Sequence, residues 1–424
     1  MIQSVRILDP ASGKDELGDI LVEDGKIAAL GCLGPEAPGI DAQTVCGRGL
    51  VAVPGLVDMH VHLRDPGFTY KEDVISGCRA AAAGGVTSLL AMPNTRPVTD
   101  TPEIVAGILE KAQRADARVY IAAAITAGLK SETLNDLKAL RNAGAIAVSD
   151  DGRPVTDTSL MAEAMKQAPE WGLLVTAHCE DLYLASGGII NEGEVSRALG
   201  VKGIPAAAED CGTAREIALA AAYGVPVHIC HVSTAGSVAL VRDAKRRGVK
   251  VTAETCPHYF MLTEEALRGR DADYRMNPPL RTETDRAAII EGLMDGTLDA
   301  IATDHAPHSP EEKLDFEKAP NGSIGMETSL AAGITALVKP GYLSLAALVE
   351  KMSCVPAKIL GIDAGTLRQG GPADIALFDE GETWMVDETR LHGKSRNTPF
   401  KGMELTGKVK MTVCRGKIVY QDER

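Results

Sequence analysis

Residues 54–67 read PGLVDMHVHLRDPG, an apolar run that ends in two imidazole side chains. His60 and His62 stand two positions apart, and side chains two apart on a β-strand point to the same face. The run before them is almost continuously apolar, which is typical of a parallel strand covered on both faces. We therefore interpret this stretch as a buried strand that carries both histidines to its carboxyl end, facing the same way.

Similar runs recur through the middle of the chain and set the fold class. Most intervals between them are rich in Ala, Leu, Glu and Lys and have helical composition, as at 73–83, 102–113 and 213–223. Eight buried strands with intervening helices predict a closed (β/α)8 barrel of the TIM type. The rival, an open doubly wound sheet, would carry a Gly-rich phosphate turn after its first strand, and none is seen. The eight runs are residues 50–62, 87–94, 118–126, 145–151, 173–180, 225–232, 250–259 and 299–305.

The two ends of the chain have a different character from the middle. Short β-like runs broken by Gly, Pro and Asp fill residues 1–50 and 366–424, and such runs are typical of a small β domain. Neither end is large enough to form a stable sheet domain alone, so we predict that they pair. The predicted α/β architecture is a barrel over residues 53–365 and a small β-sandwich domain from residues 1–52 and 366–424.

Composition excludes several classes of protein. The chain has 424 residues, 45% hydrophobic and 24% charged, which are ordinary globular values. Its net charge of −14 and its 4% of aromatic residues make nucleic acid an unexpected partner. We expect neither a signal peptide nor a membrane segment. The nine cysteines stand singly, which favours free thiols in a reducing cytoplasm.

Potential metal ligands terminate several of the eight runs. The carboxyl ends of barrel strands meet at one mouth, and imidazoles and carboxylates are suitable ligands for Zn²⁺. Four histidines and two aspartates exceed what one ion takes, whereas a two-metal site with a bridging carboxylate would use them all. Only one of Asp150 and Asp151 should face inward, and parity leaves both open. The candidates are His60, His62, Asp150 or Asp151, His178, His231 and Asp304.

Structural interpretations compete with these assignments. A lone histidine at a strand end can be a hydrogen-bonded structural residue, and Asp304 could cap the next helix. His228 and His231 stand three apart in one run and point to opposite faces, so we expect His228 to be structural. His258 is expected to be a wall residue that supports the metal shell. Cys230 is expected to turn away from the metal as a small buried apolar residue.

Residues beside the expected ligands suggest a substrate with a carboxylate. Arg64, on the loop after the first run, could hold a carboxylate through two parallel hydrogen bonds. Asn94 offers a donor and an acceptor, and His308 follows the last expected ligand by four positions. The structural alternatives are an ion pair from Arg64 to Asp65 or Asp73, a turn role for Asn94 before Pro97 and a solvated loop position for His308.

Eight segments together resemble the dihydroorotase family of the amidohydrolase superfamily. The likeness runs over nearly the whole chain, and the combination is specific, whereas His-x-His alone marks only the superfamily. The segments are DMHVHLRDPG at 58–67, MPNT at 92–95, SDDG at 149–152, AHCE at 177–180, HVS at 231–233, MNPPLR at 276–281, TDHAPH at 303–308 and NTPF at 397–400.

The resemblance implies a cyclic amide hydrolase of pyrimidine synthesis, which reversibly interconverts N-carbamoyl-L-aspartate with L-dihydroorotate and water. Many relatives bridge two metal ions with a carbamylated Lys on the fourth strand. This chain has Asp151 there, as in a bacterial subgroup of dihydroorotases. By residue match, one or two zinc ions per subunit would be held by His60, His62, Asp151, His178, His231 and Asp304.

The same match assigns the substrate contacts and the catalytic residue. We expect zinc to make hydroxide available as the nucleophile, and Asp304 to be the general acid and base that takes and returns the proton. Family members are often homodimers, and some associate with aspartate transcarbamoylase. The expected substrate-binding residues are His62, Arg64, Asn94 and His308 around the carboxylate and Asn277, Asn321 and Gly322 around the ring.

Two alternatives stay open. One is a different cyclic amide hydrolase, such as an allantoinase-like enzyme, although hydantoinases, dihydropyrimidinases and allantoinases usually keep the bridging Lys. The other is a non-enzymatic partner that holds a transcarbamoylase assembly together. Such partners have lost their metal histidines, whereas this chain retains all of them.

Overall fold

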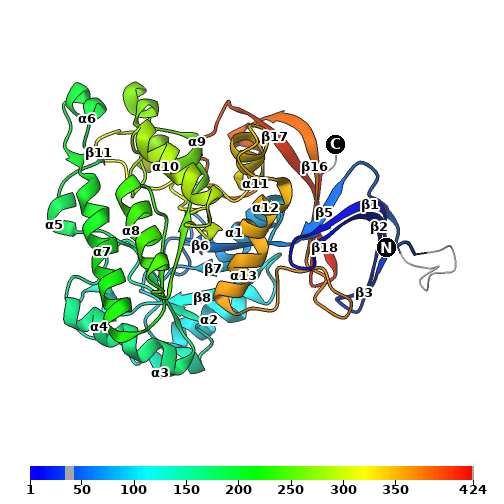
Figure 1. Ribbon diagram of the computed structural model, residues 1–424, viewed down its shortest axis with the longest axis horizontal. Helices are drawn as coiled ribbons and strands as arrows, with labels where there is room; N and C mark the ends of the chain where they lie inside the picture. The colour runs from blue at the N-terminus through cyan, green and yellow to red at the C-terminus, as the bar shows by residue number, and fades with distance from the viewer. Residues whose placement is uncertain (34–42, 423–424) are drawn as a thin grey trace.

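Two eight-stranded sheets organise the protein, which the computed structural model describes over residues 1–33 and 43–422. One sheet forms the barrel, and the other gathers strands from both ends of the chain. Figure 1 shows the helix-covered barrel on the left and the terminal sheet projecting on the right. The architecture therefore separates a central α/β unit from a β layer to which both ends of the sequence contribute.

The barrel sheet is parallel throughout, in the order β15-β14-β13-β10-β9-β8-β7-β6. A parallel bridge between Val61 and His305 joins its first strand to the segment after its last. The barrel is thus nearly closed, and the predicted fold is confirmed. Its strands are β6 (Leu56–Val61), β7 (Val86–Ala91), β8 (Arg118–Ala123), β9 (Ala147–Val148), β10 (Leu174–Ala177), β13 (Val227–Ile229), β14 (Val251–Thr255) and β15 (Ala300–Ile301).

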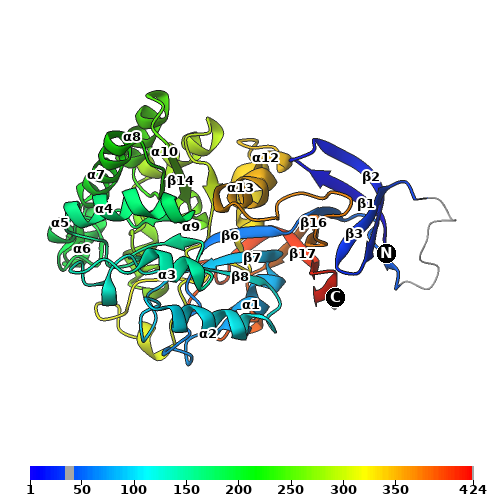
Figure 2. The same cartoon turned by 90° about the horizontal axis from the view of Figure 1, so that it is seen from below.

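Helices surround the barrel strands (Figure 2). Asp73 begins α1 by accepting a hydrogen bond from the Ser76 backbone N–H at 2.8 Å, which satisfies a donor that the helix leaves unpaired. None of the described helices is long and apolar enough to cross a membrane. The helices are α1 (Val74–Ala83), α2 (Pro102–Ala112), α3 (Leu137–Asn142), α4 (Thr158–Gln167), α5 (Leu182–Ala185), α6 (Glu194–Leu199), α7 (Ala206–Tyr223), α8 (Ala235–Arg246), α9 (Pro257–Met261), α10 (Glu283–Met294), α11 (Ser329–Gly333), α12 (Leu345–Val349) and α13 (Val355–Leu360), and the small pair β11 (Ile190–Asn191) and β12 (Gly203–Ile204) lies between α5 and α7.

The terminal sheet joins the two ends of the chain. Its path is β18-β17-β16-β5-β1-β2-β3, with β4 paired to β1, so the expected sandwich is hydrogen-bonded as one continuous mixed sheet. Ile7, Ala52, Ile375 and Met411 belong to one buried apolar cluster, which neither end could form by itself. The strands are β1 (Ile2–Asp9), β2 (Lys14–Glu23), β3 (Lys26–Gly31), β4 (Val45–Cys46), β5 (Val51–Pro54), β16 (Ile375–Met385), β17 (Glu404–Cys414) and β18 (Lys417–Gln421).

The first apolar run, residues 50–62, does not form one strand. It divides at Gly55 into β5, which pairs with β1 and β16 of the terminal sheet, and β6 of the barrel. A Cβ at Gly55 would lie 2.1 Å from Thr87 Oγ1, so the close approach at this passage between sheets requires glycine. The domain boundary expected at residue 52 falls inside β5, and the division of the chain into domains stays a prediction.

The seventh run, residues 250–259, is also shorter as a strand than expected. β14 ends at Thr255, and Pro257 is the first residue of α9. Proline has no N–H for a strand ladder and is favoured at the first position of a helix. His258 therefore lies on a short helix after the strand and not at the end of the strand itself.

Candidate metal centre

Six side chains converge at the carboxyl ends of the barrel strands. β6 carries His60, and the others lie within three residues after β6, β9, β10, β13 and β15. All six are buried, with exposed fractions of 0–6%. The apolar strands thus deliver titratable groups into an interior where an unpaired polar atom is costly. The six residues are His60, His62, Asp151, His178, His231 and Asp304.

One half of the centre is built by the first and last strands. His62 Nε2 lies 3.0 Å from Asp304 Oδ1, and His60 Nε2 lies 3.6 Å from the same oxygen. Asp151 faces both rings, with its Oδ1 atom 3.1 Å from His60 Nε2 and its Oδ2 atom 3.5 Å from His62 Nε2.

The other half shares Asp151. Asp151 Oδ1 lies 3.5 Å from His178 Nδ1 and 3.7 Å from His231 Nε2. The two ring nitrogens of His178 and His231 are 2.9 Å apart. One carboxylate oxygen therefore stands between two groups of imidazole nitrogens, which is the place of a bridging ligand.

The spacing of these atoms fits divalent metal ions. Two nitrogen or oxygen ligands, each ~2.0–2.1 Å from a tetrahedral ion, are about 3.3 Å apart, and the distances above scatter around that value. His60 Nε2 and Asp151 Oδ1 are fully buried and lack a hydrogen-bond partner within the described structure, although they face each other. Lone pairs that meet without a hydrogen between them suit a shared cation, so the residues present fit the metal that the sequence predicts.

Electrostatics also favour positive charge at the centre. Burial opposes charge on His178, but Asp151 and Glu180 outweigh it and raise the pKa of its imidazole to about 10. Burial also opposes charge on Asp304, which would raise its pKa. The hydrogen bond from His62 and the charge of His60 outweigh burial and bring that pKa down to about 2. The carboxylates are therefore ionised and need cations, either protons on the rings or metal ions that replace them.

The open choice between Asp150 and Asp151 is settled by their contacts. Asp150 accepts hydrogen bonds from the backbone N–H of Thr126, at 3.0 Å, and from its hydroxyl. Asp150 thus ties two strand ends together outside the centre, while Asp151 faces the histidines.

Backbone conformation helps to aim three of the site residues. Arg64, His231 and Asp304 have φ angles of 61°, 38° and 47°, in the left-handed region that side chains other than glycine seldom adopt. Such conformations cost energy and cluster at functional sites. All three positions lie just after barrel strands, at the mouth where the proposed ligands meet.

Three residues hold the far side of the proposed ligand rings. His60 Nδ1 lies 3.2 Å from Glu254 Oε1, His62 Nδ1 lies 2.7 Å from Asn94 Oδ1, and His178 Nε2 lies 3.3 Å from Glu180 Oε2. A ring nitrogen that donates on one side presents the lone pair of its other nitrogen to a metal. The sequence reasoning assigned no role to Glu180 or Glu254. A glutamate within an otherwise apolar strand-end run was the signal that could have found them.

Asn94 contacts two of the proposed metal ligands. Besides His62, its side chain reaches Asp151, with Nδ2 donating to Oδ2 at 3.4 Å. The alternative of a turn residue before Pro97 does not describe these contacts. Asn94 lies where it orients two proposed ligands, next to the expected substrate position.

A group of buried cations flanks the centre. Arg64 donates from Nε to the Pro307 carbonyl at 3.1 Å, and its NH2 group lies 3.4 Å from His308 Nε2. Lys71 approaches the other ring nitrogen of His308 at 3.3 Å and pairs with Glu312 at 2.9 Å. Arg64, Lys71 and His308 are each no more than 9% exposed. In a chain of net charge −14, the cations Arg64 and Lys71 bring positive charge to this place, as a site for an anion requires.

The alternative ion pairs for Arg64 are taken by other residues. Asp65 pairs with Lys111 at 2.5 Å, and Asp73 pairs with Lys394 while capping α1. Burial lowers the pKa of Arg64 to about 10, so its guanidinium stays charged at neutral pH. Arg64 is thus a buried cation next to the proposed ligands and without either expected carboxylate partner.

His308 is neutral and oriented by its neighbours. Burial and the charges of Arg64 and Lys71 lower its pKa, and its Nε2 atom lies 2.9 Å from the Asn321 carbonyl oxygen. The lone pair of Nδ1 then faces the Lys71 ammonium, which leaves Nε2 as the N–H donor. That N–H group donates to the Asn321 carbonyl, so the Arg64 guanidinium is the donor that remains for a carboxylate. The solvated position that was the alternative for His308 is excluded by its 5% exposure.

The expected ring contacts lie at the same mouth. Asn277 Nδ2 donates to both oxygens of Glu180 at 3.2 Å, and its Oδ1 atom is buried without a partner in the described part of the chain. Gly322 has a φ of 137°, and a Cβ there would meet Ala306 at 2.7 Å. Asn321 is held by Arg275, whose NH2 donates to Oδ1 at 3.1 Å.

Three neighbouring residues clarify the wall of the site. His228 is buried and lies behind Glu254, 3.3 Å from Oε2, and outside the ligand group. His258 is buried near Asp304 and His231, and burial lowers the pKa of its imidazole to about 4. The Cys230 sulfur lies near His60 and Glu254 and is not in either group of ligand atoms around Asp151. Its neighbours fill this corner with polar atoms, which the alternation of a single strand could not reveal.

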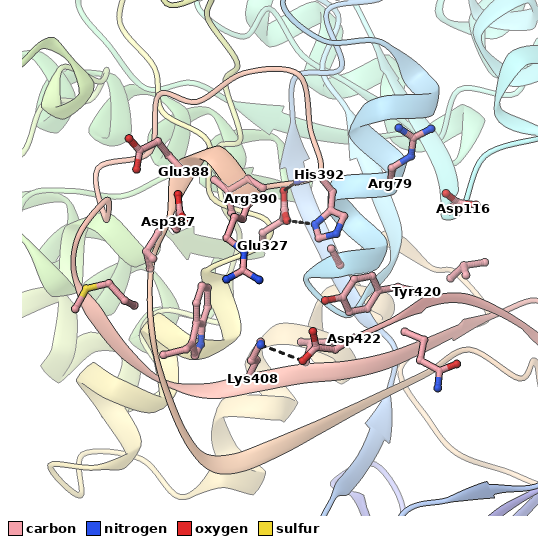
Figure 3. A pocket seen from close by; sticks show the side chains of 18 of the residues that line it. Arg79, Asp116, Glu327, Asp387, Glu388, Arg390, His392, Lys408, Tyr420 and Asp422 are labelled. Atoms are coloured by element: carbon pink, nitrogen blue, oxygen red, sulfur yellow. Dashed lines mark hydrogen bonds and ion pairs between the residues drawn. The ribbon is translucent and has the colours of Figure 1, made fainter. Parts of the chain in front are cut away.

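A cavity of about 970 Å³ lies elsewhere, between the end of α1, the β17–β18 hairpin and the segment 384–392. Figure 3 shows two pairs among its side chains, Glu327 bonded to His392 and Lys408 to Asp422. None of the described residues that line it is an expected ligand or substrate contact. Size alone therefore does not locate the chemistry of this protein.

Comparisons of sequence show what the chain is similar to. Residues 49–237 match a family described as dihydro-orotase-like, and residues 207–420 match the amidohydrolase family. A dihydroorotase of Geobacter metallireducens is 52% identical over 423 residues, with 99% of each chain covered. A dihydroorotase of Acetivibrio thermocellus is 48% identical, with 100% of this chain and 99% of the relative covered.

Solved structures show the same likeness at the level of the fold. An L-hydantoinase of Arthrobacter aurescens superposes with a TM-score of 0.88 at 27% identity, covering 100% of this chain and 96% of the other. A dihydropyrimidinase of Brevibacillus agri superposes with a TM-score of 0.86 at 27% identity, covering 100% and 95%.

Proposed function

Because this chain belongs to the dihydroorotase-like family of amidohydrolases, we propose that it is a zinc-dependent dihydroorotase. It is a hydrolase of cyclic amides, as its relatives are. The proposed reaction is the reversible interconversion of N-carbamoyl-L-aspartate and L-dihydroorotate plus water, a step of de novo UMP synthesis.

The observation that carries this proposal is the buried cluster around Asp151. Four histidines and two aspartates from separate strands approach one another at ligand distances, and a buried arginine stands beside them. The reaction needs a polarised amide carbonyl, a proton acceptor and a carboxylate anchor. The barrel mouth offers a set of metal-binding residues for the first, Asp304 for the second and Arg64 for the third.

Proton transfer is the part that we assign to Asp304. Zinc ions in such a site make hydroxide available near neutral pH and polarise a carbonyl oxygen. With a pKa of about 2, Asp304 is ionised at neutral pH and accepts a proton on a carboxylate oxygen. In ring opening it delivers this proton to the departing ring nitrogen. In ring closure it removes a proton from the carbamoyl nitrogen.

Substrate orientation is the part that we assign to the cations and amides. Arg64 binds the carboxylate, with His308 beside it, and Lys71 keeps His308 in the tautomer whose Nε2–H group donates to the Asn321 carbonyl. Asn277 contacts the ring through its unpartnered Oδ1 atom. The backbone of Asn321 and Gly322 forms the adjoining wall, where glycine at residue 322 allows close packing against Ala306.

The test is a ring-opening assay of the purified protein on L-dihydroorotate, hydantoin and allantoin, with zinc and other divalent metals measured in the same sample. The proposal expects turnover of dihydroorotate well above that of the other two amides, in proportion to bound metal. Preferential turnover of allantoin or hydantoin would assign another amide. Absence of metal and of turnover would leave the role of a non-enzymatic assembly partner.

We further propose that the enzyme works in the cytoplasm as a homodimer and that a transcarbamoylase is a possible second partner. All nine cysteines are free thiols in the described structure, which supports a reducing compartment. Light scattering of the purified chain, alone and with aspartate transcarbamoylase, measures both associations.

A further inference from the structure

A row of buried polar groups runs from the proposed metal centre into the barrel wall. His60 Nδ1 lies 3.2 Å from Glu254 Oε1, and Glu254 Oε2 lies 3.3 Å from His228 Nε2. His228 Nδ1 lies 2.8 Å from Thr252 Oγ1. Glu254 and His228 are fully buried, and neither contacts the substrate side of the mouth in the described structure.

The proton positions along this row follow from the donors available. We infer that the proton of the His228 imidazole is on Nε2, because that atom faces the Glu254 carboxylate, and the Thr252 hydroxyl then donates to Nδ1. The lone pair of His60 Nε2 is needed on the metal side, where it faces Asp151, so the proton of His60 sits on Nδ1. Glu254 is thus a carboxylate whose Oε1 atom faces His60 Nδ1 at 3.2 Å and whose Oε2 atom lies 3.3 Å from His228 Nε2.

The burial of the Glu254 carboxylate needs a physical explanation. An ionised glutamate inside a barrel of apolar strands is costly unless donors surround it. The Glu254 oxygens lie 3.2 Å from His60 Nδ1 and 3.3 Å from His228 Nε2, so two imidazole nitrogens flank the buried carboxylate. A hydrophobic residue would pack here without that cost, and would leave the Nδ1 proton of His60 without an acceptor.

We propose that Glu254, braced by His228, is a positioning residue that fixes the tautomer and ring orientation of His60 for metal binding. Carboxylates behind a ligating imidazole also raise its basicity, and their loss typically weakens metal affinity by ~10–100-fold. His228 acts only through Glu254, because its Nε2 atom reaches no proposed ligand. This inference rests on the proposed metal site and deepens it.

The test measures the zinc affinity of the metal-free protein by competition with a chelator. This readout does not depend on turnover. Glu254→Gln keeps the shape of the side chain but presents an NH2 group to one of the two N–H donors. We expect its dissociation constant for zinc to rise about 10–100-fold. His228→Gln should shift the constant in the same direction and by less, since Glu254 still accepts from His60.

The double variant distinguishes an effect of His228 that acts through Glu254 from two independent structural defects. If His228 works through Glu254, Glu254→Gln/His228→Gln binds zinc no more weakly than Glu254→Gln alone, whereas independent effects would add. Glu216→Gln is the matched control, because Glu216 is another buried glutamate but pairs with Arg215 on α7. Its zinc affinity should equal that of the wild type.

A spectroscopic measurement keeps the inference testable even if a variant fails to fold. In the zinc-loaded wild type, the ¹⁵N shifts of His60 should report a protonated Nδ1 atom. A protonated Nε2 atom, unchanged zinc affinity in Glu254→Gln, or additive losses in the double variant would each overturn the inference. A wild type that binds no divalent metal would overturn the proposed function as well, so the two failures are distinguishable.

Discussion

The barrel mouth and the cavity beside the β17–β18 hairpin differ in how their polar groups are partnered. The cavity is large, about 970 Å³, yet Glu327 bonds to His392 at 2.7 Å and Lys408 pairs with Asp422 at 3.0 Å. At the mouth, His60 Nε2 and Asp151 Oδ1 are buried and face each other without a hydrogen bond in the described structure. Functional chemistry is therefore marked by buried groups that lack partners more than by open volume.

The two regions also differ in how strongly their charged groups are screened by water. The charged groups of the cavity are partly exposed, so their pairs are screened by water and contribute little energy. Those of the mouth are at most 9% exposed, where the same charges interact strongly. Substitutions at the mouth should accordingly change activity, and substitutions in the cavity should change stability slightly.

The largest effect is expected for Asp304→Asn. The amide keeps the shape but cannot accept a proton, and positioned proton transfer is worth about 10²–10⁴-fold in rate. We expect kcat for dihydroorotate ring opening to fall at least 10²-fold by that principle, measured with zinc content in parallel. Near-normal turnover in this variant would remove Asp304 from the role of general acid and base.

Arg64→Lys should have the second largest effect, mainly on KM. Lysine keeps the charge but loses the two parallel hydrogen bonds to a carboxylate, and one such bond is worth about 1.5–3 kcal/mol. Steady-state kinetics should show KM raised about 10–100-fold. Arg390→Lys in the cavity is the matched control and should leave kcat and KM unchanged. Equal behaviour of the two variants would break the distinction between the regions.

Lys71→Met should have a smaller effect of the same kind. Without the ammonium, the tautomer of His308 is no longer fixed, and the loss of one hydrogen bond costs about 1 kcal/mol, or about fivefold in KM. The same kinetic assay measures it. An unchanged KM with a lowered kcat would instead place Lys71 in proton transfer.

The smallest effect belongs to the cavity pair and depends on pH. The hydrogen bond from Glu327 raises the pKa of His392 in the folded protein. The pair therefore stabilises the fold fully below the unfolded pKa of about 6.5, and this contribution disappears as pH rises through the folded pKa. His392→Gln should lower the free energy of unfolding by about 0.2–1 kcal/mol at low pH. Denaturant unfolding at two pH values measures this, and a loss that grows with pH would contradict it.

The sequence predicted the barrel because burial on both faces leaves a continuous apolar run, as in residues 87–94 and 118–126. It missed the break at Gly55, since only the neighbouring Thr87 shows why the chain needs glycine there. It also extended the seventh strand past Pro257, although the proline was a visible sign of the helix start.

The sequence predicted the site residues that lie at strand ends. It did not predict the contacts that form between separate segments of the chain. His60 and His62 are two apart in one strand, so their shared face follows from the sequence alone. The pairing of Glu254 with His60 and of Lys71 with His308 joins residues 194 and 237 positions apart. Such contacts depend on barrel closure and loop paths, which no local pattern encodes.

The central claim is that the mouth, and not the cavity, holds the metal that the reaction needs. Anomalous X-ray diffraction of zinc-loaded crystals, with turnover measured before and after chelation, tests it most directly. The account predicts zinc peaks among His60, His62, Asp151 and Asp304, and loss of dihydroorotate turnover when the metal is removed. Full turnover by metal-free protein, or zinc bound only in the cavity, would contradict it.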